Sequence, residues 1–319
     1  MKSKIAGIFL TIGVIIAAAA FMTTDAEAAG CSHEQVDDWG DCVYCGQYIG
    51  TEWVKVDGKW RYYDYYDGTM AVGWKEVPND NYDYYWYYFN QDGSMVTGWK
   101  KFGKVWYYFK SSGVMATEWQ KIGGYWYFFA EYYEDNAGVM ATGWRLIHNN
   151  NYDYYWYYFN SSGTMATGWK KAGNKWYYLK PSGIMAEGWQ KIGGKWYYFD
   201  ASSGAMSTGW KEIPNANYDY YWYYFNSSGT MVTGWKKIGS TWYYFKTNGV
   251  MAVDWQKIGG KWYLFDDEGA MLTGWTWVYY TNYGYGEYYY FRSNGVMVTG
   301  RQKIDGRYYT FSSTGELIS

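Results

Sequence analysis

The sequence predicts an all-β protein, a β-solenoid built from stacked β-hairpins. A unit of 20 to 25 residues recurs from about Thr51 to the end of the chain. Each copy holds two short runs rich in Trp, Tyr, Phe and Ile on either side of a turn, which is typical of a hairpin. The chain has 40 Gly and only 3 Pro, which fits many tight turns. Because an isolated hairpin is marginal in water, each copy has to stack on the next.

Two aromatic positions mark each copy, as in GWKKIGSTWYYFKTNGVMAV at residues 234–253. A leading Trp is followed by an inner aromatic that opens a W-Y-Y-F run, then by a Gly-containing turn and a Met. The leading position is held by Trp53, Trp74, Trp99, Trp119, Trp144, Trp169, Trp189, Trp210, Trp235, Trp255 and Trp275, and by Arg301 in a degenerate twelfth copy. The inner position is held by Trp60, Trp86, Trp106, Trp126, Trp156, Trp176, Trp196, Trp222, Trp242 and Trp262, then by Tyr288 and Tyr308.

The copies also follow a longer period of three. Three of them have a lengthened hairpin turn, with the sequence NYDYYWYYFN starting at Asn81, Asn151 and Asn217. Another carries its extra residues later, as AEYYEDNAG after Phe129. One long and two short hairpins per unit suggest that each hairpin is rotated by about a third of a turn from the last. We therefore expect about three repeats per turn of a superhelix.

Both faces of each hairpin are aromatic. Strand alternation places Trp242 and Tyr244 on one face, and Tyr243 and Phe245 on the other. Both faces must be covered or used in binding. We expect the Tyr and Phe of each copy to pack between hairpins. The two Trp are expected to pack and to bind ligand, since a stack needs bulk but not repeated paired indoles.

Residues 1–28 have the pattern of an export signal. Lys2 and Lys4 precede an apolar stretch over residues 5–22, and Ala-Glu-Ala at 26–28 supplies the small residues of a cleavage site. An uncleaved membrane anchor is the alternative, although the apolar stretch is only marginally long enough. We expect a secreted protein of the cell wall or cell surface, which meets the membrane only if this segment is retained or lipidated.

A short segment, residues 29–50, lies between the signal and the repeat region at 51–319, and it carries all three Cys. The spacing of Cys31, His33, Cys42 and Cys45 would allow these four side chains to bind a structural zinc ion with tetrahedral geometry. A disulfide between Cys42 and Cys45 is an alternative in an oxidising compartment. Lipidation of Cys31 is a third interpretation, because Ala28-Ala29-Gly30-Cys31 is a weak match to a lipoprotein box.

Two broad function classes are disfavoured by the composition. The formal net charge of −2 gives no bulk attraction to nucleic acid. His33 and His148 are the only His, and the usual nucleophile and metal-hydrolase motifs are absent from the sequence. We therefore expect neither a nucleic-acid-binding protein nor an enzyme, and no cofactor for the repeats.

The pattern G-W-x-K-x-G-x-W-Y-Y-F-x-x-x-G-x-M-x-T-G-W resembles the choline-binding (cell-wall-binding) repeat of Gram-positive surface proteins and phage lysins. The resemblance covers roughly Thr51 to Ser319. It implies a left-handed superhelix of hairpins with choline headgroups of teichoic acids bound between consecutive hairpins. It also implies a cage of two aromatics from one repeat and one from the next, with a Met close by. One such cage would use Trp99 and Trp106 near Met115, and the aromatic of the next hairpin is left open.

The ligand-binding residues expected from this resemblance are the leading and inner Trp given above, with Met115. A quaternary ammonium such as that of choline has no N–H to donate, so aromatic faces rather than hydrogen bonds select it. Tyr288 in place of an inner Trp weakens the prediction for its copy. The last copy has Arg301 and Tyr308 instead of both Trp, which is typical of a cap.

The predicted function is that of a non-catalytic surface protein that attaches to choline residues of wall teichoic or lipoteichoic acids. A carbohydrate-binding module of the glucan type is the alternative, because flat aromatics also stack on sugar rings. Its partners would then be other cell-surface glycans. A structural or adhesive surface rod is the third possibility.

Overall fold

The computed structural model describes residues 53–64, 68–79, 81–280 and 284–319. The predicted export signal (1–28) and the predicted zinc ligands Cys31, His33, Cys42 and Cys45 lie outside these ranges. Within them, no helix is long and apolar enough to cross a membrane. The described part of the chain also holds no group of three or more His, Cys, Asp or Glu that could bind a metal ion.

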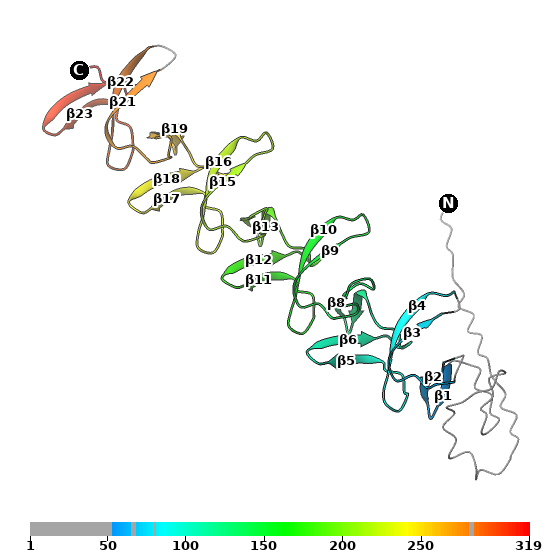
Figure 1. Ribbon diagram of the computed structural model, residues 1–319. Coiled ribbons are helices and arrows are strands. Elements are labelled where there is room, and N and C mark those ends of the chain that lie inside the picture. Colours follow the sequence, from blue (N-terminus) through cyan, green and yellow to red (C-terminus); the bar gives the residue numbers. More distant parts are fainter. Residues whose placement is uncertain (1–52, 65–67, 80, 281–283) are drawn as a thin grey trace, which may run out of the picture. The chain divides into compact units, whose positions relative to one another are not determined.

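The described residues form twelve two-stranded antiparallel sheets, each a hairpin of consecutive strands (Figure 1). The hairpins are β1 (Trp53–Val56) with β2 (Lys59–Tyr62), β3 (Gly73–Pro78) with β4 (Tyr84–Phe89), β5 (Gly98–Phe102) with β6 (Val105–Phe109), β7 (Glu118–Ile122) with β8 (Tyr125–Phe129), β9 (Gly143–His148) with β10 (Tyr154–Phe159), β11 (Gly168–Ala172) with β12 (Lys175–Leu179), β13 (Gly188–Ile192) with β14 (Lys195–Phe199), β15 (Gly209–Pro214) with β16 (Tyr220–Phe225), β17 (Gly234–Ile238) with β18 (Thr241–Phe245), β19 (Asp254–Ile258) with β20 (Lys261–Phe265), β21 (Gly274–Tyr280) with β22 (Tyr285–Phe291), and β23 (Gly300–Ile304) with β24 (Arg307–Phe311).

The chain divides into two compact units. The first unit runs to Gln120 and includes Phe129–Met140, and the second unit comprises Lys121–Phe128 and Ala141–Ser319. The hairpins of each unit are built in the same way.

Register within a hairpin is set by the repeat sequence. In β17–β18, Gly234 lies opposite Phe245, and Trp235 lies opposite Tyr244. After β18 the chain turns back, and Met251 forms a β-bridge with Phe245. Strand alternation then places the leading Trp on one face of the hairpin and the Phe on the other.

A backbone hydrogen bond joins each loop to the preceding hairpin. The N–H of Met251 donates to the carbonyl oxygen of Trp222 over 2.8 Å, and the N–H of Met271 donates to that of Trp242 over 2.9 Å. The same bond between a Met and an inner Trp recurs at Met95 with Trp60, Met115 with Trp86, Met185 with Trp156, Met206 with Trp176, Met231 with Trp196 and Met297 with Trp262. Stacking of the hairpins therefore supplies hydrogen-bond partners to backbone N–H and C=O groups, and it also buries side chains.

The core lies between successive hairpins. Trp210 packs on two aromatics of the following hairpin, with ring centroids 4.9 Å from Tyr243 and 5.6 Å from Phe245. The last residue of the W-Y-Y-F run is fully buried in most copies, at Phe89, Phe109, Phe129, Phe159, Phe199, Phe225, Phe245 and Phe291, and at Leu179 where Leu replaces it. The predicted all-β fold of stacked hairpins is confirmed, and each hairpin uses both of its aromatic faces.

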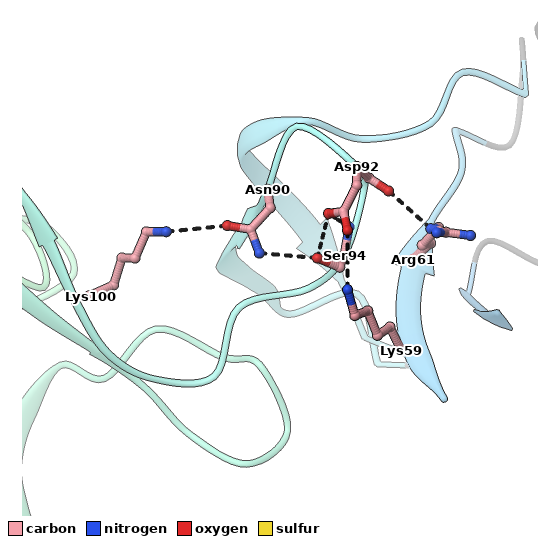
Figure 2. A network of polar contacts seen from close by, with 6 residues as sticks. All are labelled: Lys59, Arg61, Asn90, Asp92, Ser94 and Lys100. Atoms are coloured by element: carbon pink, nitrogen blue, oxygen red, sulfur yellow. Dashed lines mark hydrogen bonds and ion pairs between the residues drawn. The ribbon is translucent and has the colours of Figure 1, made fainter. Parts of the chain in front are cut away.

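Polar contacts hold the loops against hairpins on either side. In the loop after β4, the carboxylate of Asp92 accepts hydrogen bonds from the N–H of Ser94 (3.1 Å) and from the ammonium of Lys59 (3.2 Å), as Figure 2 shows. The Arg61 Nε donates to the carbonyl oxygen of Asp92 over 3.1 Å. The hydrogen bonds from Ser94, followed by that from Lys59, hold the pKa of Asp92 well below its usual range. The loop after β4 is thereby fastened to β2 and its turn.

The other side of this loop contacts the next hairpin. Asn90 donates from Nδ2 to the Ser94 hydroxyl over 3.0 Å and accepts from Lys100 over 3.2 Å (Figure 2). An equivalent bond joins Lys170 to Asn160 over 3.0 Å in the second unit. Because these groups are partly exposed, each bond is worth little by itself, but together they orient the loops that border the cavities described next.

Candidate ligand-binding cages

The paired Trp of one hairpin form two walls of a cavity. The rings of Trp235 and Trp242 have centroids 6.4 Å apart and planes at 84°. Tyr263 of the following hairpin adds a third wall, with its ring centroid 4.8 Å from that of Trp235. These rings, with Met271 and the loop residues Ser293 and Asn294, line a cavity of about 360 Å³. We refer to such an arrangement of two Trp, a Tyr and a Met as a cage.

Three successive hairpins contribute to each cage. β17–β18 supplies the two Trp, β19–β20 with its loop supplies the Tyr and the Met, and the loop after β22 closes the rim. The same set lines three further cavities: Trp210, Trp222, Tyr243 and Met251 with Asp267 and Glu268 (about 360 Å³); Trp53, Trp60, Tyr87 and Met95 with Ser111 and Ser112 (about 180 Å³); and Trp74, Trp86, Tyr107 and Met115 with Tyr132 and residues 134–137 (about 480 Å³).

The perpendicular Trp pair is a regular feature of the repeats. In eight hairpins the ring centroids lie 6.2 to 6.5 Å apart and the planes meet at 81° to 89°. The contact from the leading Trp to a Tyr of the next hairpin recurs in Trp144–Tyr177, Trp169–Tyr197, Trp189–Tyr223 and Trp255–Tyr289, at 4.8 to 4.9 Å.

Exposure separates the Trp from the Phe of the same run. The Trp235 and Trp242 side chains are 37% and 42% exposed, whereas Phe245 is 0% exposed. An indole that served only to fill the stack would be buried like the Phe. The Trp are therefore partly free to contact a ligand while one edge packs against the neighbouring hairpin.

The aromatic walls of the cages are uncharged rings whose faces can attract a cation. Burial raises the pKa of the Tyr107 hydroxyl, so this ring is neutral across the physiological range. Lys side chains of the protein itself lie over the inner indoles, and the ammonium of Lys101 is 5.6 Å from the ring centroid of Trp106. The same contact occurs at 5.7 to 5.9 Å for Lys55 over Trp60, Lys121 over Trp126, Lys191 over Trp196 and Lys257 over Trp262. These indole faces already attract positive charge.

A family model for the choline-binding repeat matches six overlapping segments of the sequence, at residues 79–118, 96–132, 150–187, 166–209, 207–254 and 252–285. These segments cover more than half of the chain. The chain belongs to the choline-binding repeat family.

Solved structures of Streptococcus pneumoniae proteins agree with this assignment. The choline-binding repeat protein described here is 33% identical to CbpJ of strain TIGR4, with a TM-score of 0.63 over 79% of this chain and 95% of that one. It is 34% identical to choline binding protein F, CbpF, with a TM-score of 0.59 over 78% of this chain and 92% of that one. No curated protein sequence matches the chain significantly.

In eight of the described hairpins, this choline-binding repeat protein brings the predicted leading and inner Trp together. The structure also shows which aromatic of the next hairpin joins them, which the sequence left open. It is the Tyr directly after the inner Trp of the next hairpin, as Tyr263 follows Trp262. Strand alternation could have found it, because a residue next to the inner Trp points to the other face, toward the preceding hairpin.

The predicted place of Met115 is wrong. The sequence placed Met115 with Trp99 and Trp106 of its own hairpin, but its side chain lines the cavity of Trp74 and Trp86. The backbone explains the difference, because the N–H of Met115 donates to the carbonyl oxygen of Trp86 over 2.8 Å. Each Met therefore joins the cage of the preceding hairpin.

The two C-terminal copies depart from the cage. In β23–β24 the guanidinium of Arg301 lies over the ring of Tyr308, 4.3 Å from its centroid, in place of a Trp pair. In β21–β22 the ring of Tyr288 packs on Trp277 at 4.7 Å, a contact that the repeat pattern did not predict.

The Met of a cage is held under a Gly of the following loop, which gives a testable prediction. A Cβ on Gly269 (φ +80°) would lie 2.3 Å from the Sδ of Met251, whereas a Cβ on Gly260 (φ +79°) meets nothing within 4 Å. Because positive φ alone costs a non-Gly residue about 1–2 kcal/mol, Gly260→Ala should destabilise by roughly that amount. Gly269→Ala should cost more and should also displace Met251.

Denaturant unfolding and the ¹³C-methyl NMR signal of Met251 measure the two effects. Equal costs for the two substitutions, with an unmoved Met251 signal, would show that this contact does not position the Met.

Proposed function

We propose that this protein is a non-catalytic cell-surface protein that attaches to choline residues of wall teichoic or lipoteichoic acids through its cages. The observation that carries the proposal is the repeated pair of half-exposed, perpendicular indoles closed by a Tyr and a Met from the next hairpin. Membership of the choline-binding repeat family supports choline as the ligand.

The cage suits a quaternary ammonium for a physical reason. Such a group cannot donate a hydrogen bond, but its diffuse positive charge is attracted to aromatic faces, by about 0.5–2 kcal/mol for each favourable contact. In the cavity of Trp235, Trp242 and Tyr263, three rings face one small space beside the thioether of Met271. These polarisable side chains are expected to hold the methyl groups by dispersion.

Two structures of one relative, CbpF, bear on the ligand and on the surface that carries it. One structure of CbpF is a complex with ipratropium obtained by soaking, and ipratropium carries a quaternary ammonium. Another was solved in the presence of a peptidoglycan analogue, a tetrasaccharide-pentapeptide. We infer that the present protein likewise acts on the cell wall, as a secreted binding protein.

A binding role without catalysis fits the described residues. The described hairpins lie between Trp53 and Phe311. His148 lies at the end of β9, where its ring stacks on Tyr152 at 5.6 Å and its Nδ1 is 3.0 Å from the carbonyl oxygen of Asn149. This placement gives the imidazole a local structural partner in a hairpin turn.

Retention on a tertiary- or quaternary-amine resin, followed by elution with free choline, tests the proposal. We expect the protein to be retained and then released by choline. Retention on dextran with indifference to choline would contradict it and would favour the glucan-binding alternative.

The acidic rim of one cage should strengthen choline binding. Asp267 and Glu268 border the cage of Trp210 and Trp222, where another cage has Ser293 and Asn294. A carboxylate about 8 Å from a bound ammonium contributes roughly 0.5 kcal/mol in water. Replacing Asp267 by Ser and Glu268 by Asn should therefore weaken choline binding at this cage by about fivefold.

The Met251 methyl signal in ¹³C NMR reports on this cage separately, because Met251 lines it. The difference between variant and parent should shrink at about 1 M salt, where the screening length is about 3 Å. The reverse exchange, Ser293→Asp with Asn294→Glu, is the matched control and should strengthen binding at Met271. An affinity at Met251 that is unchanged at low salt would rule out an electrostatic contribution from the rim.

A further inference from the structure

Five Tyr side chains gather beside the cage of Trp74 and Trp86 in the first unit. Tyr82, Tyr84 and Tyr85 come from the β3–β4 turn and the start of β4, whereas Tyr132 and Tyr133 come from the loop after β8. Together with Asp83, Trp86, Met115 and Thr117 they line a cavity of about 570 Å³. We call this cavity the tyrosine groove.

The groove gathers exposed aromatic side chains from two segments of the chain. Tyr133 is 95% exposed, Tyr82 is 81% exposed and Tyr84 is 54% exposed. These rings add little to the hairpin core, where the buried residues are the Phe of each copy. Clustered exposed aromatic side chains in a concave surface are typical of a binding site.

The turn that carries Tyr82 and Tyr84 is held by its own hydrogen bonds. The side-chain oxygen of Asn79 accepts from the N–H of Asn81 and of Asp83, both over 2.9 Å. The N–H of Tyr82 donates to the carbonyl oxygen of Asn79 over 3.0 Å. These hydrogen bonds hold the backbone at Tyr82 and Asp83, where the exposed rings begin.

The opposite wall is fastened to the same hairpin. The hydroxyl of Tyr132 donates to the carboxylate of Glu76 on β3. The ring of Tyr132 also contacts that of Tyr133 edge-on, with centroids 5.2 Å apart. The N–H of Gly138 closes the loop onto the carbonyl oxygen of Ala130 over 2.9 Å. A surface held in this way loses little conformational freedom when a ligand binds.

The groove depends on an insertion that occurs once. The sequence NYDYYWYYFN is repeated at residues 151–160 and 217–226, and Tyr152, Tyr154, Tyr218 and Tyr220 are similarly exposed. The AEYYEDNAG segment at 130–138, which supplies Tyr132 and Tyr133, has no second copy in the sequence. The turn at 217–226 is therefore a matched control that has the same tyrosines without the inserted wall.

We propose that the tyrosine groove binds an uncharged oligosaccharide. Rigid, amphipathic Tyr rings supply flat contact area for the C–H faces of sugar rings, and their hydroxyls add hydrogen bonds at low entropic cost. Asp83 and Thr117 add further acceptors and a donor for sugar hydroxyls. Asp83 in the groove, and Glu134 and Asp135 in the adjoining cage, disfavour an anionic chain.

The groove and the cage share three lining residues, Trp86, Met115 and Tyr132. A sugar in the groove would therefore lie directly beside a ligand in the cage. This site goes beyond choline binding and does not require it, since four of its five tyrosines, all but Tyr132, do not line the cage.

The test follows the ¹³C-methyl signal of Met115 in the full chain during titration with maltotetraose, isomaltotetraose and tetra-N-acetylchitotetraose. We expect at least one of these probes to shift the Met115 signal saturably. Tyr82→Ala with Tyr84→Ala should weaken that probe at least tenfold. The matched pair Tyr218→Ala with Tyr220→Ala should leave its affinity unchanged.

Choline titration at Met251 and Met271 in the same samples shows that the groove variant is folded and tests the cages separately. Loss of choline response there, with the sugar response kept, would contradict the proposed function and leave the groove intact. The groove proposal is overturned if none of the three probes shifts Met115. It is also overturned if the matched variant loses as much affinity as the groove variant, because binding would then belong to exposed tyrosines in general.

Discussion

Replacing Phe225 by Ala is expected to lower the free energy of unfolding by about 3–5 kcal/mol, as large-to-small changes in a packed core do. Phe225 is 0% exposed. Its ring centroid lies 5.7 Å from that of Trp189 and 6.5 Å from that of Tyr198, both on the preceding hairpin. The substitution would leave a cavity between two hairpins. Few other buried side chains lie there that could move to fill it.

Denaturant unfolding with hydrogen exchange checks this expectation. Because each repeat contacts mainly its neighbours, exchange should accelerate most in β13–β16. Phe225→Leu should cost much less, since Leu179 occupies the same position in β12 and is equally buried. Tyr220→Ala, at a 61% exposed position of the same strand, should be nearly neutral. A similar cost for Phe225→Ala and Tyr220→Ala would contradict the packing account.

Replacing Trp242 by Ala is expected to abolish choline binding at its cage while leaving the hairpin folded. Trp242 is 42% exposed and forms one wall of the cavity with Trp235 and Tyr263. A strong cation–π contact of about 2 kcal/mol, combined with lost contact area, corresponds to an affinity loss of at least about thirtyfold. The hydrogen bond from the N–H of Met271 uses the backbone carbonyl of Trp242, so it survives the substitution.

Titration with choline, followed at the methyl signals of Met271 and Met251, measures this loss. The Met271 response should disappear, while the Met251 response, which reports on the cage of Trp210 and Trp222, should persist. Trp242→Tyr should retain part of the affinity, because a smaller aromatic face remains. An undiminished Met271 response in Trp242→Ala would show that the indole only packs.

The hairpins and their core were predictable because the same pattern of aromatic residues and Gly turns recurs in each copy of the repeat. The W-Y-Y-F run fixes strand alternation, and the structure buries Phe245 while leaving Trp242 half-exposed, as the expected division of roles requires. The pairing of Trp235 with Trp242 follows from the same alternation, since both lie on one face of a single hairpin.

The remaining cage residues could not be read from the repeat pattern. Met271 and Asn294 come from the next hairpin and the one after it, so their places depend on how far each hairpin advances along the stack. That distance is set by packing between hairpins rather than by any local signal. The misplacement of Met115 has the same cause. The tyrosine groove likewise depends on where the insertion at 130–138 folds back, which its composition does not state.

We propose that the cages select a quaternary ammonium by its charge. Comparing choline with its uncharged carbon analogue, 3,3-dimethylbutan-1-ol, tests this claim most directly, because the two ligands have nearly the same shape. The signals of Met95, Met251 and Met271 report on three cages in one titration. We expect saturable choline binding at all three and at least tenfold weaker binding of the analogue. Equal affinities for the two ligands, or no response to choline, would contradict the account.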